Sequence, residues 1–230
     1  MLTMRRAARA ARPNVRRETA AQKSARVLEI LKRLRRARPG AKIELNHSNA
    51  LELLVATILA AQCTDKRVNE VTKTLFRKYP NPIAYASADR AVLEQEIKST
   101  GFFRNKTKSI IAACQKIVAD HGGEVPATMD ELLTLPGVAR KTANVVLGNV
   151  FGIPSGIVVD THIQRVAYRL GLTTARTPEQ IEQYLMALLP KRNWIEFSTH
   201  VVLHGRYVCT ARNPDCPHCP VEPLCPKIGL

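Results

Sequence analysis

Four cysteines in the last quarter of the chain constrain its fold more than any other feature. They are spaced C-x6-C-x2-C-x5-C, at Cys209, Cys216, Cys219 and Cys225. Thiolates so close in sequence can converge on one soft metal centre, because closing such short loops costs little chain entropy. The sequence therefore predicts a C-terminal segment built around a metal.

Three kinds of site fit four cysteines at this spacing. Structural zinc sites usually pair two short knuckles or mix cysteine with histidine, whereas a 4Fe–4S cluster tolerates wider and uneven spans. Only Cys216 and Cys219 form a C-x-x-C pair, which favours the cluster. Disulfides need an oxidising compartment, and the chain opens Met1-Leu2-Thr3 without an apolar signal segment. Zinc and disulfides stay open as alternatives at this point.

Positive charge is concentrated at the start of the chain. The formal net charge is +16, and residues 1–38 hold thirteen Lys and Arg against two acids, Glu18 and Glu29. We expect residues 1–23 to be a disordered basic leader that binds a polyanion, most simply nucleic acid. The alternative is a solvated tail with no partner. An Arg-rich start also resembles a mitochondrial transit peptide, but no Ser occurs through Arg17.

Hydrophobic periodicity predicts an all-α protein. The apolar stripes recur at helix spacing, and several begin at a capping residue, such as Asn49 with Glu52 and Thr128 with Glu131. The only alternating run is the short segment 157–159. Cys63 and Cys114 lie in apolar helical patterns and are expected to be core residues. The expected helices are 24–38, 49–59, 65–78, 88–98, 106–121, 129–134, 140–150, 161–170, 178–189 and 194–203.

A Pro-Gly turn joins two of the expected helices, at residues 135–139, and Arg140-Lys141-Thr142 follow it. The first N–H groups of a helix have no intrahelical partner and lie at the positive end of its dipole. Such a turn can bind phosphate through its main chain without reading bases. Taken alone, a helix–Pro-Gly–helix segment is more often a plain turn.

The run LPGVARKTANVVL at residues 135–147 resembles the helix-hairpin-helix of the endonuclease III family of DNA glycosylases. VDTH at 159–162 resembles that family's catalytic carboxylate loop, and HGR at 204–206, leading into the four cysteines, resembles its iron–sulfur domain. AQCTD at 61–65 is similar to its Gln-bearing turn. The resemblance runs from about residue 27 to 225 and implies a 4Fe–4S cofactor. One departure is Ala139, which replaces the second glycine of the usual L-P-G-V-G hairpin. A methyl there can restrict the backbone or slightly alter the phosphate contact, so the motif identifies the hairpin but leaves its geometry open at this position.

Lys141 and Asp160 are the catalytic residues that the resemblance implies. An amine that attacks the sugar C1′ during base removal gives a Schiff base, from which the 2′-proton is lost and the 3′-phosphate eliminated. The start of a helix and burial beneath bound DNA both favour the neutral, nucleophilic amine at Lys141. Asp160 precedes the helix at 161–170, so its carboxylate is expected to cap that helix while it faces the positive sugar. Without the resemblance, a phosphate-contacting lysine and an ordinary cap would be the simpler interpretations.

Base excision requires the nucleotide to leave the stack, and side chains must fill the gap. The resemblance assigns this task to Gln62, which can bond the orphaned base, and to Phe102, an apolar wedge. A core position beside Phe103 is the alternative for Phe102. The loop between the first two cysteines holds one cation, Arg212, which can meet a phosphate although Asp215 opposes it. The predicted DNA-binding residues are Gln62, Phe102, Leu135, Gly137, Ala139, Arg140, Thr142, His162 and Arg212.

The sequence thus predicts a two-lobed, all-α glycosylase. Residues 45–152 form a helical barrel with the hairpin, and residues 24–44 with 153–230 form a discontinuous iron–sulfur domain. DNA is expected between the lobes, where Lys141 and Asp160 face each other. The expected activity is removal of oxidised pyrimidines from duplex DNA with AP lyase cleavage, because adenine-mismatch relatives usually have no lysine at the Lys141 position. The rivals are such a mismatch glycosylase and a non-catalytic iron–sulfur DNA-binding or redox protein.

Other expectations concern the partners and the compartment. We expect a monomer that acts on DNA with damaged bases or abasic sites and has no membrane partner. The expected location is the bacterial cytoplasm in association with the nucleoid, rather than a mitochondrion or a nucleus.

Overall fold

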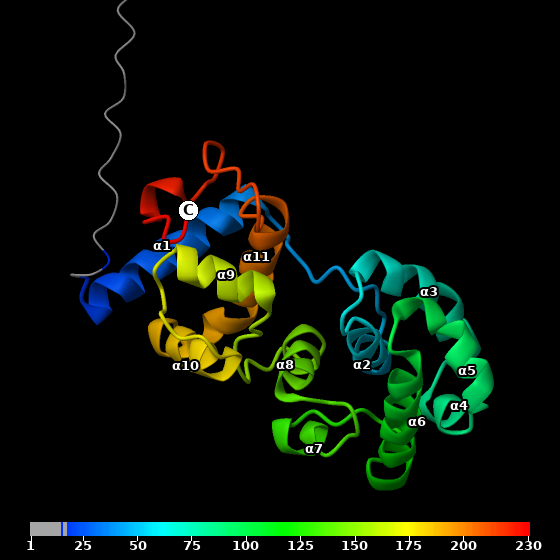
Figure 1. Ribbon diagram of the computed structural model, residues 1–230. Coiled ribbons are helices and arrows are strands. Elements are labelled where there is room, and N and C mark those ends of the chain that lie inside the picture. Colours follow the sequence, from blue (N-terminus) through cyan, green and yellow to red (C-terminus); the bar gives the residue numbers. More distant parts are fainter. Residues whose placement is uncertain (1–14, 16–17) are drawn as a thin grey trace, which may run out of the picture. The chain divides into compact units, whose positions relative to one another are not determined.

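The computed structural model of the protein describes residue 15 and residues 18–230, and this part is built from helices and loops (Figure 1). It contains no strand, which confirms the all-α prediction for the described residues. The alternating segment 157–159 is in no helix or strand, and the Val158 N–H donates to the hydroxyl of Ser198, 3.1 Å away. None of the helices in the described part is both long and apolar enough to cross a membrane.

The chain divides into two compact units. One unit comprises the residues up to Ala41 together with Ile157–Leu230, and the other is Lys42–Gly156. We call them the cysteine unit and the hairpin unit. The boundaries expected from the sequence lie at 44/45 and 152/153.

The cysteine unit packs its helices around one apolar core. Val27, Ile30 and Leu31 of α1 are fully buried against Ile163 and Val166 of α9. Cys209, Cys219 and Cys225 pack against the same core, so the C-terminal loops belong to this unit. The elements are α1 (Ala20–Ala37), α9 (Thr161–Arg169), α10 (Pro178–Leu188), η2 (Lys191–Asn193), α11 (Trp194–Tyr207) and η3 (Glu222–Leu224).

The hairpin unit has a second core. Leu53 and Leu59 of one helix and Ile110 and Ile117 of another are buried in it, with Tyr85. Helix α6 contacts α2, α4 and α5, and α8 contacts α2 and α7. The elements are α2 (Ala50–Leu59), α3 (Asp65–Lys78), α4 (Pro82–Ala86), α5 (Arg90–Glu96), η1 (Lys98–Thr100), α6 (Phe103–Asp120), α7 (Met129–Leu133) and α8 (Arg140–Asn149).

Several helix predictions need correction. Helix α11 continues to Tyr207 rather than ending at residue 203, and α6 begins at Phe103 rather than at residue 106. Helix α1 begins at Ala20 rather than at residue 24, because Thr19 and Gln22 form a complete capping box. The end of the predicted leader is therefore helical, while residues 1–14 and 16–17 of that leader lie outside the described residues. Helix α4 was not predicted, because its five residues are too few to show a periodic stripe.

Candidate functional site

The hairpin between α7 and α8, residues 135–139, is anchored by the buried side chains of Leu135 and Val138. The Val138 N–H closes the turn on the Leu135 carbonyl at 3.1 Å. Gly137 has a φ of +79°, and a Cβ there would lie 2.5 Å from the Cβ of Ser109 on α6. Only glycine fits this position, because a side chain would meet both backbone strain and a clash. Leu135 as a whole residue is only 2% exposed, so its predicted contact with DNA stays a prediction.

Ala139 is the N-cap residue of α8, in an extended conformation with φ −93° and ψ 167°. Alanine adopts this conformation freely, so the methyl group of Ala139 does not restrict the backbone at this position. Alanine supplies no side-chain acceptor, and no side chain caps α8. The first turn of α8 therefore presents main-chain N–H groups at the positive end of the helix. Arg140 and Lys141 in that turn are exposed, and Thr142 is half-buried.

Asp160 occupies the equivalent position in the cysteine unit but does cap its helix. Its Oδ1 accepts the N–H of Ile163 at 2.8 Å, so the predicted cap is confirmed. Nearby His162 is half-buried, and its Nδ1 lies 3.2 Å from Nη2 of Arg165. Helix α11 approaches closely at this point, since a Cβ on Gly205 would lie 2.9 Å from the Cβ of His162. This close approach explains the glycine of the segment 204–206.

Gln62 and Phe102 lie on exposed turns of the hairpin unit. Gln62 follows α2, and Phe102 directly precedes α6. Both have left-handed backbones, with φ of 54° and 48°. The Phe102 side chain is 62% exposed, which excludes the core alternative. Exposed side chains on left-handed residues are unusual and often functional.

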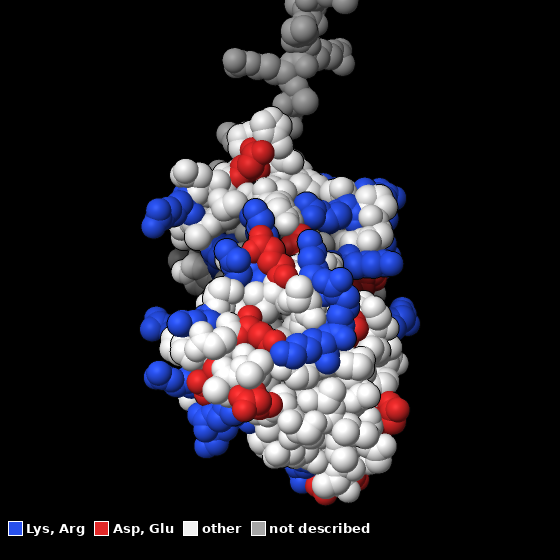
Figure 2. Space-filling model, turned by 90° about the vertical axis from the view of Figure 1, so that its right-hand side faces the viewer, with Lys and Arg blue, Asp and Glu red and all other residues white. Residues whose placement is uncertain are grey.

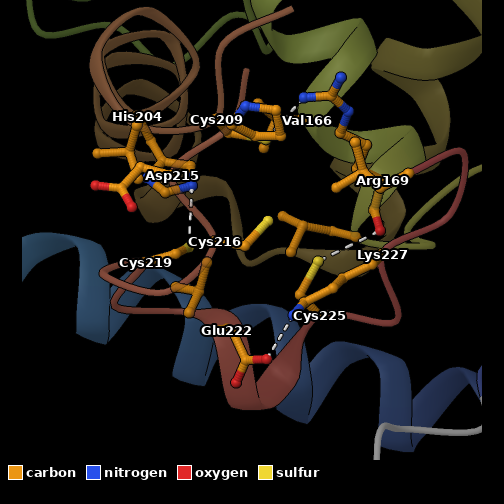
Figure 3. Close-up of a pocket in the computed structure, with 15 residues that line it drawn as sticks. Val166, Arg169, His204, Cys209, Asp215, Cys216, Cys219, Glu222, Cys225 and Lys227 are labelled. Atoms are coloured by element: carbon orange, nitrogen blue, oxygen red, sulfur yellow. Dashed lines mark hydrogen bonds and ion pairs between the residues drawn. The ribbon is translucent and has the colours of Figure 1, made fainter. Parts of the chain in front are cut away.

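The four cysteines of residues 209–225, the cysteine segment, line one pocket (Figure 3). Apolar side chains of Val166, Leu170 and Val221 form part of its wall. Burial raises the pKa of the Cys219 thiol to about 11 and also raises the pKa of Cys225. The pocket thus brings four thiols together, and those of Cys219 and Cys225 are shielded from water. In the described part, no three His, Cys, Asp or Glu side chains are arranged to hold a single metal ion.

Two arginines of α9, which the sequence analysis missed, fasten the cysteine segment. Arg169 donates from Nη1 to Sγ of Cys209 at 3.4 Å and to the Thr210 carbonyl at 2.6 Å. Arg165 donates from Nε to the Cys209 carbonyl at 3.2 Å. Their i, i+4 spacing on an amphipathic helix was the available signal.

One histidine also contacts the pocket. His204 Nε2 lies 3.7 Å from Sγ of Cys219 (Figure 3). Burial lowers the pKa of His204 to about 4, so the ring is neutral near pH 7.

One expectation about a single residue changes. Arg212 is exposed, and the carboxylate of Asp215, which is expected to oppose it, lies 2.8 Å from Nδ1 of His218. Cys114 is buried, whereas Cys63 is half-exposed in the turn after α2, so the core prediction for Cys63 is wrong.

The face in Figure 2 carries many Lys and Arg side chains with fewer Asp and Glu among them.

Comparison with known proteins identifies the family. Residues 55–191 match the family described as HhH-GPD superfamily base excision DNA repair protein. Endonuclease III of Synechocystis sp. is 55% identical over 207 residues, which cover 90% of this chain and 94% of that protein. The chain belongs to the endonuclease III family.

Solved structures of endonuclease III have the same fold. A non-covalent endonuclease III–DNA complex superposes with a TM-score of 0.84 at 43% identity, covering 89% of this chain and 95% of that one. A trapped endonuclease III–DNA covalent intermediate gives the same TM-score and identity, with 89% and 96% covered. The predicted family, the helix-hairpin-helix glycosylase fold and the assignment as a base-excision-repair DNA glycosylase are confirmed.

Proposed function

We propose that this glycosylase removes oxidised pyrimidines from duplex DNA and then cleaves the strand through a Schiff base on Lys141. The observation that carries the proposal is the exposed Lys141 in the first turn of α8, a helix that no side chain caps. Phosphates of bound DNA would accept the N–H groups there and would hold the strand against the hairpin. The DNA in two solved endonuclease III structures supports DNA as the partner.

The chemistry needs a nucleophile and an anion. Nζ of Lys141 attacks C1′ as the C1′–N bond breaks and the base leaves with the electron pair. Opening of the C1′–O4′ bond then gives the Schiff base, and loss of its 2′-proton expels the 3′-phosphate with the electrons of the C3′–O bond. The Asp160 carboxylate would stabilise the positive charge that develops on the sugar. Its bond with the Ile163 N–H fixes the orientation of the carboxylate before substrate arrives. The lysine favours this bifunctional reaction over that of an adenine-mismatch glycosylase.

Gln62 and Phe102 would fill the space that the extruded nucleotide leaves. Phe102 exposes an aromatic face that can stack on a base, and Gln62 offers both a donor and an acceptor to the unpaired one. The remaining proposed DNA contacts are Leu135, Gly137, Ala139, Arg140, Thr142, His162 and Arg212.

We propose a 4Fe–4S cluster as the group held by Cys209, Cys216, Cys219 and Cys225. Four thiols around one apolar pocket fit a thiolate-ligated cluster, and the Arg169 contact to Sγ of Cys209 would offset part of its negative charge. When bound, the cluster supplies ligand bonds that tie four points of the segment together. We further propose a monomer that works on the bacterial nucleoid in the cytoplasm.

Borohydride trapping on duplexes with one oxidised pyrimidine tests the proposal. Wild-type protein should give a covalent adduct and a strand break, and Lys141→Gln should give neither while it still binds the duplex. Lys73→Gln, an exposed lysine on α3, is the matched control and should behave as wild type. Strand cleavage by Lys141→Gln at the wild-type rate would refute the assignment.

A substrate panel separates the alternative functions. Duplexes with an oxidised pyrimidine, hypoxanthine, mismatched adenine or an abasic site should be processed at different rates, and the first and last should be the fastest. Preference for mismatched adenine, or no turnover of any duplex, would favour one of the two rivals.

A further inference from the structure

Lys106, in the first turn of α6, is a buried cation that the reaction described above does not use. Its side chain is 5% exposed, and no other lysine in the described part of the chain is buried. Nζ donates to the carbonyl of Leu59 at 2.8 Å and to the carbonyl of Thr100 at 2.8 Å. Burial lowers the pKa of the ammonium. Burying an ammonium group without partners costs free energy. The two hydrogen bonds to main-chain oxygens offset that cost, so Nζ is held where both can form.

The two carbonyls belong to the two turns that carry Gln62 and Phe102. Leu59 is the last residue of α2, three residues before Gln62, and Thr100 is the last residue of η1, two residues before Phe102. Because one nitrogen bonds both oxygens, the ends of α2 and η1 are held close together. Residues 59–62 and 100–102 are therefore braced against each other by a single side chain.

The backbones of Gln62 and Phe102 are strained, so a contact that holds their two turns in place helps to maintain them. Gln62 and Phe102 are the only non-glycine residues of the hairpin unit with positive φ. A left-handed backbone costs free energy for a residue with a side chain and persists only where its surroundings enforce it. Both residues are exposed, so the positions of their side chains depend on their backbones.

We propose that Lys106 is a positioning residue for base extrusion, which holds the Gln62 turn and the Phe102 turn at a fixed separation so that both enter the duplex together. The inference rests on the proposed roles of Gln62 and Phe102. Lys106 touches neither the DNA nor the reacting atoms in this account. It acts through Leu59 and Thr100.

Lys106→Met tests this role, because methionine keeps the length and apolar stem of the side chain but removes the donors. Single-turnover base excision should fall by about 10- to 100-fold, the loss expected when catalytic groups are misplaced by about 1 Å. The fluorescence change of a 2-aminopurine placed beside the lesion, which reports extrusion, should fall in parallel. Lys116→Met is the matched control on the same helix, where a half-exposed lysine pairs with Asp120, and it should change neither.

A double-mutant comparison separates positioning from general destabilisation. In a Gln62→Ala, Phe102→Ala background the braced side chains are gone, so adding Lys106→Met should slow excision by less than threefold. Ile117→Ala removes core packing from the same helix, and it should slow excision equally in both backgrounds. If Lys106→Met does not accumulate as folded protein, Lys106→Leu, which also removes the donors, takes its place.

Each outcome decides one claim. Wild-type excision by the folded Lys106 variant, or an equal loss in both backgrounds, would overturn the inference about Lys106. Wild-type excision by Gln62→Ala and by Phe102→Ala would instead refute the proposed roles of those two residues.

Discussion

The hairpin and the cysteine segment are both short, irregular stretches, yet they keep their shapes by different means. The hairpin is held by its own residues. Its turn is closed by a main-chain hydrogen bond, Gly137 has a left-handed backbone, and Leu135 and Val138 are buried. The cysteine segment, residues 209–225, has one short helix, η3, and several hydrogen-bonded turns of its own, and α9 arginines also fasten it. The hairpin is therefore preformed, whereas we infer that the cysteine segment depends on the group it binds.

Cysteine replacement should give the largest difference between the two regions. Cys219→Ser should lose bound iron and destabilise the cysteine unit by more than about 3 kcal/mol, because the binding energy of a structural metal site is also folding energy. Iron analysis and thermal unfolding followed by circular dichroism measure this. Cys63→Ser, a half-exposed thiol in the hairpin unit, should retain iron and stability. Stoichiometric zinc without iron in the wild-type protein would contradict the cluster assignment.

Asp160→Asn should lower the rate of base removal without lowering the stability of the cysteine unit. Asparagine is as good an N-cap as aspartate, so α9 and the iron content should be unchanged. Base removal should slow by roughly 100-fold, because the variant loses the charge that stabilises the transition state. Single-turnover base release and strand scission, measured together, provide the check. A variant with the same activity as wild type would reduce Asp160 to a plain helix cap.

Gly137→Ala tests whether the hairpin is preformed by its backbone. The added Cβ meets Ser109 and a left-handed backbone, so the turn must shift, and we expect affinity for undamaged duplex to fall by about tenfold. Ala139→Gly is the matched control, since its extended backbone needs no glycine, and it should bind within about twofold of wild type. Fluorescence anisotropy measures both. Equal affinities for the two variants would show that the turn is not the phosphate contact.

Deleting residues 1–14 should have the smallest effect. The deletion removes four arginines and no acid, and it leaves Thr19, which caps α1, and Glu18, which pairs with Arg26 at 2.7 Å. Binding to damaged and undamaged duplex should weaken by similar factors. The slope of log affinity against log salt should become shallower by about 0.9 for each phosphate that these arginines neutralise in the full-length protein. An unchanged salt slope would mean that this segment does not touch DNA.

The sequence predicted most helices because their signals are local. Thr64, for example, caps α3, and Gly123 closes α6 by donating to the Ile117 carbonyl at 3.0 Å. Both lie at the helix end that they define, where capping and left-handed glycine rules apply directly. The start of α1 was missed although Thr19 and Gln22 carry the same kind of signal, because the basic composition around them suggested disorder.

The sequence could not predict contacts between distant residues. The bond from Lys106 to Leu59 spans 47 residues, and that from Arg169 to Cys209 spans 40. Nothing in the local pattern distinguishes a lysine that folds inward from one that reaches solvent, because both fit a helix. The left-handed backbones of Gln62 and Phe102 were equally hidden, since glycine rather than glutamine or phenylalanine is the usual signal for positive φ.

Peptide mapping of the borohydride-trapped complex tests the central claim most directly. After reduction on a duplex with one oxidised pyrimidine, digestion of protein and DNA should leave a sugar-derived mass on a single peptide. The account predicts that this peptide contains Lys141 and that fragmentation places the added mass on its Nζ. An adduct on any other lysine or on the N-terminal amine would contradict it.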